Sequence, residues 1–148
     1  MAANDQQVGG AHYQKGKVQH WDVVTIYGIC YLMGNASKYL LRWRDKNGVQ
    51  DLQKCQHYVD KAVEMWKAGH GLNMVVITPV PEAVVQELTT NHRMTEQEGK
   101  ILRIMLRPLS IESLLTCKYM VASLLRHTEK FHPGTPEDGG HHSKQEET

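Results

Sequence analysis

Hydrophobic residues recur with a helical period in three successive segments of the first half of the chain. A first helix is predicted over residues 19–31, where the apolar period is imperfect. A second is predicted over residues 33–45, with an apolar stripe made by Leu32, Ala36, Tyr39 and Trp43. The third, over residues 49–68, has the most continuous apolar face, made by Leu52, Cys55, Val59, Ala62, Val63 and Trp66. The short break at Asn47-Gly48 predicts that the second and third helices pack antiparallel.

The second half of the chain returns to a helical pattern after a connector at residues 70–81. The MVVIT segment of this connector is expected to form a short strand, which the prolines that follow would end. Three further helices are predicted, at residues 81–90, 95–107 and 110–131. Thr95 and Glu98 form a capping box at the start of the middle one. We therefore expect an all-α fold, with a helical hairpin core and additional C-terminal helices.

Both ends of the chain differ from this pattern. Residues 1–10 are small and polar, and we expect a flexible N-terminus. Residues 132–148 combine proline, glycine and charges without an apolar period, and we expect a disordered tail. His141 and His142 in that tail are adjacent, a weak metal-binding signal in a solvated segment. The expected organisation is thus a helical domain at residues 11–69, with a further helical region at residues 70–131 packed on it.

Composition and charge narrow the class of protein. The chain has 148 residues, and its formal net charge is +1, so global charge gives no argument for binding nucleic acid or membranes. Its three cysteines are far apart, which predicts reduced thiols. No apolar run reaches the roughly 18 residues that a membrane span requires, and the N-terminus lacks the apolar core of a signal peptide. We expect a cytoplasmic protein without a membrane partner.

One polar stripe runs along the predicted second helix. At 100° per residue, Asn35, Lys38, Arg42 and Lys46 lie on one side of it. A row of cations beside an amide suits phosphate oxygens, because arginine binds them as a planar fork and lysine as a movable charge. The free backbone N–H groups at the start of a helix would add to such a site. The alternative is an ordinary solvated face, on which the arginines pair with Asp45 and Asp51.

Two further clusters have weaker signals. His12 and Tyr13 lie close to Lys15 and Lys17, and this set of side chains could hold a phosphate or stack on a base. Ordinary packing before a helix explains the His-Tyr pair equally well. One turn of helix separates two carboxylates, Asp60 and Glu64, which could hold Mg²⁺ or simply face water. The sequence has no phosphate loop of the G-x-x-x-x-G-K type and no cysteine cluster for zinc.

The spacing of these polar residues resembles a small domain family that is common in phage genomes. The residues that carry the resemblance are His12-Tyr13, Gly34-Asn35, Lys38-Tyr39, Arg42, Lys46, Gly48, Asp51-Leu52, Lys54 and Tyr58, within about residues 11–67. The best understood member is a coliphage kinase that phosphorylates deoxynucleoside monophosphates without a P-loop. The resemblance implies nucleotide binding by His12, Tyr13, Asn35, Lys38, Tyr39, Arg42, Lys46, Asp51, Lys54 and Tyr58. It assigns no catalytic residue.

The chain departs from that family in two places. Trp43-Arg44-Asp45 stands where many relatives carry a small residue and then glycine, which could reshape the turn. Residues 70–131 have no counterpart in the family and could form an oligomer interface or a lid.

Several functions fit these observations. The first is a phage nucleoside monophosphate kinase, which would use Mg²⁺ and complete its two nucleotide sites in a homo-oligomer. The second is a binding protein without turnover, and hence without a cofactor, that sequesters a linear or cyclic nucleotide signal of host defence. The third is a nucleic-acid-binding protein, which the low net charge and the acidic tail disfavour. A purely structural helical protein is the fourth.

Overall fold

The computed structural model describes residues 2–6, 8, 16–76 and 78–131. This part of the chain contains helices and turns but no strand, so the expected all-α fold is confirmed. The α-helices are α1 (His20–Tyr27), α2 (Tyr31–Arg42), α3 (Val49–Met65), α4 (Glu82–Asn91), α5 (Glu96–Met105) and α6 (Ile111–Phe131). The short helical turns are η1 (Ala3–Asp5), η2 (Trp43–Asp45), η3 (Trp66–His70) and η4 (Gly71–Met74).

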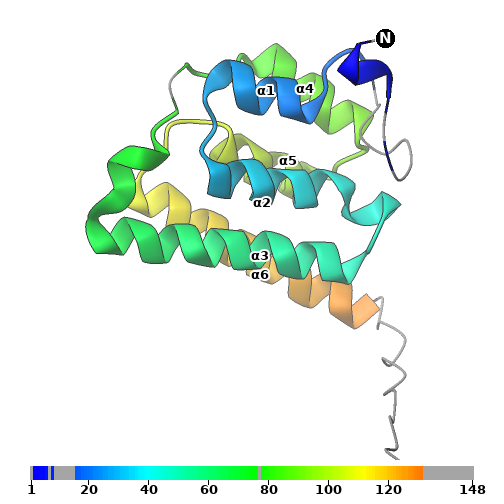
Figure 1. Ribbon diagram of the computed structural model, residues 1–148. Helices are drawn as coiled ribbons and strands as arrows, with labels where there is room; N and C mark the ends of the chain where they lie inside the picture. The colour runs from blue at the N-terminus through cyan, green and yellow to red at the C-terminus, as the bar shows by residue number, and fades with distance from the viewer. Residues whose placement is uncertain (1, 7, 9–15, 77, 132–148) are drawn as a thin grey trace, which may run out of the picture.

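Four of the helices form the core of the molecule. Helix α3 packs against α2 on one side and α6 on the other, and α5 packs against both α2 and α6. Figure 1 shows α2 and α3 running side by side, with α5 and α6 behind them. Helix α1 lies on α2 and α4 lies on α5, so these two short helices cover one side of the core. The predicted α2–α3 hairpin is therefore the front layer of this core.

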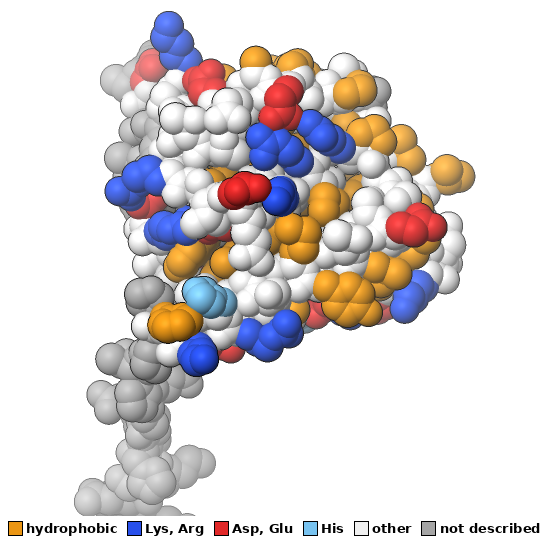
Figure 2. Space-filling view, turned by 180° about the vertical axis from the view of Figure 1, so that it is seen from behind, with side chains coloured by type: hydrophobic (Ala, Val, Ile, Leu, Met, Phe, Trp, Pro, Cys, Tyr) orange, Lys and Arg blue, Asp and Glu red, His pale blue; other side chains and the backbone are white. Residues whose placement is uncertain are grey.

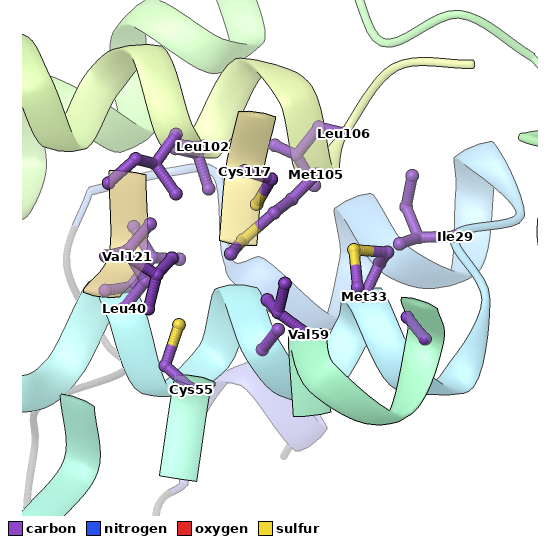
Figure 3. Close-up of a cluster of buried hydrophobic side chains, with 14 of the residues drawn as sticks. Ile29, Met33, Leu40, Cys55, Val59, Leu102, Met105, Leu106, Cys117 and Val121 are labelled. Carbon is purple, nitrogen blue, oxygen red and sulfur yellow. The ribbon is translucent and has the colours of Figure 1, made fainter. Parts of the chain in front are cut away.

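The core is a continuous apolar cluster to which all four of these helices contribute. Figure 3 shows Met33 and Leu40 of α2 facing side chains of α3, α5 and α6. The predicted apolar face of the third helix is confirmed, since Leu52, Cys55, Val59, Ala62 and Val63 are buried and Trp66 is half-buried. Full burial of a leucine or valine side chain of this face contributes roughly 1.5–3 kcal/mol. Cys30, Cys55 and Cys117 are free thiols, as expected.

Local chemistry sets the ends of the helices. The predicted capping box starts α5, because the Thr95 side chain accepts from the Glu98 backbone N–H and Glu98 reaches back to the Thr95 N–H. Helix α1 ends at Tyr27, earlier than predicted, because Gly28 adopts a left-handed conformation (φ 64°, ψ 44°). The single predicted helix over residues 19–31 is therefore wrong at its end, and Tyr31 begins α2.

Two other expectations are wrong in detail. The predicted apolar stripe of the second helix is rotated, since Leu32, Tyr39 and Trp43 are only half-buried and the buried face contains Met33, Ala36 and Leu40. The predicted stripe included the aromatic residues Tyr39 and Trp43, which lie on the side of the helix that also carries cations. The connector forms η4 and then irregular chain, and its described residues at 74–76 and 78 show no strand.

The N-terminal turn η1 is attached to α1. Asn4 donates to Asp22 at 2.7 Å and accepts from the Trp21 indole at 2.7 Å, and its carbonyl accepts from Gln19. The expected tail at residues 132–148, including His141 and His142, lies outside the described residues.

Candidate functional site

The candidate site is on the exposed face of the α2–α3 hairpin, around the ring of Tyr39. Lys38 Nζ lies 4.7 Å and Arg42 Cζ 4.6 Å from the centre of this ring. Lys54 Nζ, from α3, lies 5.4 Å from the same point. The face of a tyrosine ring carries partial negative charge and attracts cations, so the ring offsets part of the repulsion among these three groups. Two helices thus bring three cations to one aromatic ring.

Arg42 is held by a buried carboxylate rather than left open to a ligand. Its Nε and one terminal nitrogen donate to the two oxygens of Asp51 at 3.0 and 3.2 Å. Asp51 is fully buried, and the Arg42 side chain is 11% exposed. Asn47 also donates to Asp51, at 3.3 Å, and Lys54 Nζ lies 3.9 Å from it. This bidentate pair ties the end of α2 to the start of α3, so Arg42 has a structural role in addition to its charge.

The two lysines of the cluster are less constrained. Lys38 donates to the Asn35 side chain at 3.0 Å, and Asn35 donates to the Tyr31 carbonyl one turn earlier. The side chain of Lys54 is 41% exposed. Its separation of 3.9 Å from Asp51 is longer than a hydrogen bond, so a phosphate oxygen can replace this contact at low cost.

Three tyrosines form a connected row beside the cations. Tyr58 of α3 stacks on Tyr39 with ring centres 5.8 Å apart, and Tyr31 meets Tyr58 edge-on at 6.2 Å. A hydrogen bond with Tyr31, together with partial burial, raises the pKa of the Tyr58 phenol. Tyr31 is 73% exposed, which leaves its ring accessible to a ligand. Tyr31 was not among the predicted site residues. Its position four residues before Asn35, on the same side of the helix, is the signal that could have identified it.

The structure brings together most of the residues that the sequence singled out. They are Asn35, Lys38, Tyr39, Arg42, Asp51, Lys54 and Tyr58. Lys46 is separated from them, because α2 ends at Arg42 and Lys46 lies exposed in the following turn with φ −133° and ψ −91°. The polar stripe therefore does not continue along one helix as predicted. His12 and Tyr13 lie outside the described residues.

A buried histidine lies behind the cations. His20 Nε2 lies 2.8 Å from Ser37 Oγ, and Ser37 donates its own proton to the Met33 carbonyl at 2.7 Å. His20 Nε2 is therefore the donor to Ser37. Burial, with the nearby His92 and Lys38, lowers the pKa of His20 to about 3. At neutral pH this imidazole is uncharged and serves the packing of α1 on α2.

The candidate magnesium ligands are each paired with a lysine. Asp60 Oδ1 lies 3.4 Å from Lys118 Nζ, and Glu64 Oε1 lies 2.6 Å from Lys61 Nζ. No group of three or more His, Cys, Asp or Glu side chains suited to a metal ion occurs among the described residues. Of the carboxylates near the cations, Asp51 is already neutralised by Arg42. The exposed cations and tyrosine rings of this face are side chains of the kinds that contact anions and planar rings.

Comparison with known protein families gives a match to part of the chain. Residues 8–60 match the family model DUF3310, which describes proteins of unknown function. The match begins at Val8 and includes α1, α2 and most of α3. It contains every predicted site residue. No curated protein and no solved structure gives a significant match.

None of the described helices is both long enough and apolar enough to cross a membrane.

The DUF3310 region agrees in position with the resemblance found at about residues 11–67. The helices after α3 lie beyond the matched region, as that resemblance also predicted. The match itself assigns neither a phage origin nor a kinase activity.

Proposed function

We propose that the exposed face of the α2–α3 hairpin binds nucleotide phosphates and that the protein is a phage deoxynucleoside monophosphate kinase. The observation that carries the proposal is the gathering of Lys38, Arg42 and Lys54 around Tyr39, with Asp51 as the carboxylate partner of Arg42. The chain as a whole is nearly neutral, so this positive cluster is a local feature. Phosphate oxygens are the ligands that such a cluster attracts most strongly.

The geometry divides the work among the side chains. Lys38 and Lys54 come from facing helices, and a phosphate between them would satisfy both ammonium groups. Arg42 is paired with Asp51 and fixes the end of α2 against the start of α3, which positions the two lysines. Because three cations already surround the Tyr39 ring, we expect the base to stack on Tyr31, which is far more exposed.

Phosphoryl transfer suits a site of this kind. The reaction depends mainly on positioning and on neutralising phosphate charge, so a site of lysines and one arginine supplies most of what it requires. Mg²⁺, where the reaction uses it, would enter bound to the phosphates of the triphosphate donor. Asp51 does not act as a base in this scheme, because both of its oxygens are bonded to Arg42.

Sequestration of a nucleotide is the second candidate, and the pairing of Asp51 favours it. A site whose carboxylate is neutralised provides tight binding without a group that takes a proton from the acceptor. The protein would then hold a linear or cyclic nucleotide and release it unchanged.

One experiment separates the two candidates. Purified protein is incubated with each deoxynucleoside monophosphate and with a panel of cyclic nucleotides, each with and without ATP and Mg²⁺, and the mixture is chromatographed before and after heat denaturation. Diphosphate that accumulates with time indicates the kinase. A nucleotide that leaves the solution and returns unchanged on heating indicates sequestration. If every nucleotide, including cyclic ones, stays free in solution, nucleotide binding itself is wrong.

The lysines provide the test of the site. We expect Lys38→Ala and Lys54→Ala each to weaken binding of a nucleoside triphosphate by about 1.5–3 kcal/mol, the range for hydrogen bonds to charged groups. Calorimetry measures the change, and Lys67→Ala on the exposed turn η3 is the matched control. Equal affinities in all of these variants would place the phosphates elsewhere.

A further inference from the structure

An open cleft lies beside η2. It has a volume of about 690 Å³ and is bordered by η2, the first turn of α5 and the second half of α6. Its lining is Trp43, Arg44, Thr95, Glu96, Gln97, Lys100, Met120, Leu124, His127, Thr128 and Phe131. Figure 2 views the molecule from this side, where hydrophobic side chains reach the surface between groups of charged ones. A volume of this size is typical of small-molecule sites, and the lining combines four apolar or aromatic side chains with several polar and charged ones.

One wall of the cleft is a stripe along α6. Met120, Leu124, His127 and Phe131 are spaced by four, three and four residues, so they lie on one side of the helix. The rings of His127 and Phe131 are in contact, with centres 4.6 Å apart. Phe131 is 60% exposed, so this aromatic pair presents a surface to the cleft on which a planar ring can stack.

The facing wall is fixed by a buried carboxylate. Glu98 is fully buried and accepts from the Trp43 indole and from Arg44, each at 2.7 Å. The Arg44 guanidinium also lies over the Trp43 ring, 4.3 Å from its centre. Trp43 and Arg44 are therefore held in place before any ligand arrives, and a preorganised wall lowers the entropy cost of binding.

The charges of the cleft limit how much phosphate it can hold. Its two cations are both paired, Arg44 with the buried Glu98 and Lys100 with the exposed Glu96, so two cations face two carboxylates and only Lys100 has a partner that water also reaches. Lys100 pairs with Glu96 at 2.8 Å, but both side chains are largely exposed, and such pairs are weak enough to exchange for a phosphate. The hairpin site has three cations for one fully paired carboxylate. The hairpin therefore suits a polyphosphate, whereas the cleft suits a ligand with one phosphate group.

We propose that this cleft is a second ligand site, which binds a planar nitrogen heterocycle bearing a single phosphate, such as a nucleoside monophosphate. The ring stacks on the His127–Phe131 pair, Thr95 and Gln97 bond to its edge, and Lys100 with Arg44 holds the phosphate. This inference rests on the proposed function, because it assigns the acceptor to the cleft and the triphosphate to the hairpin. Arg42 belongs to the hairpin site and Trp43 and Arg44 to the cleft, so consecutive residues join the two sites.

Binding of the four deoxynucleoside monophosphates and of ATP is measured by equilibrium dialysis, on the full chain and on variants of each site. We expect Phe131→Ala and Lys100→Ala to weaken binding of the monophosphate about tenfold or more, and to leave ATP binding within twofold. Lys54→Ala should do the reverse. Tyr119→Ala, an exposed aromatic position of α6 outside the cleft lining, and Lys67→Ala are the matched controls. Far-ultraviolet circular dichroism checks that each variant is folded.

Each outcome decides between the sites. If Lys54→Ala abolishes monophosphate binding and Phe131→Ala leaves it unchanged, the cleft is overturned and the hairpin function stands. If the cleft variants alone affect the monophosphate and the hairpin variants affect nothing, the cleft stands and the hairpin function fails. If no monophosphate binds to the unmodified protein at millimolar concentration, the cleft proposal is wrong whatever ATP does.

Discussion

At the scale of single residues, two buried carboxylates join neighbouring elements of the structure. Asp51 joins the end of α2 to the start of α3 through Arg42, and Glu98 joins η2 to α5 through Trp43 and Arg44. Neither carboxylate has any exposed side chain. A buried ion pair contributes little net stability when intact, but breaking it leaves an uncompensated charge. The two pairs are therefore sensitive positions next to the two proposed ligand sites.

Removing the charge of Glu98 tests this role. We expect Glu98→Gln to lower the free energy of unfolding by about 2–4 kcal/mol, because Arg44 loses its partner and the cap of α5 is weakened. Urea denaturation followed by circular dichroism measures the loss. Glu96→Gln, whose exposed carboxylate pairs only with Lys100 at the surface, is the control and should change stability by less than about 0.5 kcal/mol. Equal effects of the two changes would mean that Glu98 is not buried.

The same residue gives a pH dependence. Burial alone would raise the pKa of Glu98, but the hydrogen bonds from Arg44, Thr95 and Trp43 outweigh it and leave the pKa lowered. A lowered carboxyl pKa contributes stability above the ordinary value of about 4.5, and this stability is lost as the pH falls through the folded value. Glu98→Gln should remove this pH-dependent contribution. Glu96→Gln, which leaves Glu98 in place, should retain it.

At the scale of elements, the hairpin shows what sequence pattern can and cannot predict. The turn at Gly48 and the apolar face of α3 follow directly from local chemistry, and both are present. The orientation of α2 was not predictable in the same way, because the Tyr39 ring lies at the edge of the core, where it also packs against cations and the ring of Tyr58. The pairing of Arg42 with Asp51 spans the turn, so only the packed hairpin reveals that this arginine is engaged.

This pairing predicts different behaviour for two cations of the same helix. Arg42→Ala removes the bidentate partner of the buried Asp51, and we expect it to lower the free energy of unfolding by about 3–5 kcal/mol. Lys38→Ala removes a partly exposed group that donates to the neutral Asn35 side chain, and we expect a loss below about 1 kcal/mol. Chemical denaturation of both variants provides the comparison. A fully stable Arg42→Ala protein would show that Asp51 is not buried in the folded chain.

At the scale of the whole molecule, the sequence predicted the fold class and the number of helical segments better than it predicted the cleft. Six helical segments were expected, and their periodicity and caps place them close to their observed bounds. The cleft combines residues 43–44, 95–100 and 120–131, which meet only when α5 and α6 pack behind the hairpin. Trp43 was interpreted as part of an apolar stripe, and nothing local could show that Glu98 binds its indole.

The buried histidine makes the packing of α1 on the core sensitive to acid. The pKa of His20 is lowered from 6.5 to about 3 in the folded chain, so the unfolded chain binds a proton more readily. Protonation therefore favours unfolding: the stability is fully present above pH 6.5, falls by about 1.4 kcal/mol per unit below it, and levels off near pH 3. His20→Gln retains a donor for Ser37 but cannot take up this proton. We expect the unfolding free energy of the variant, measured by urea titration at pH 7, 6 and 5, to decline less steeply than that of the unmodified protein. Identical slopes would show that His20 reaches solvent, and that α1 opens from the core before the molecule unfolds.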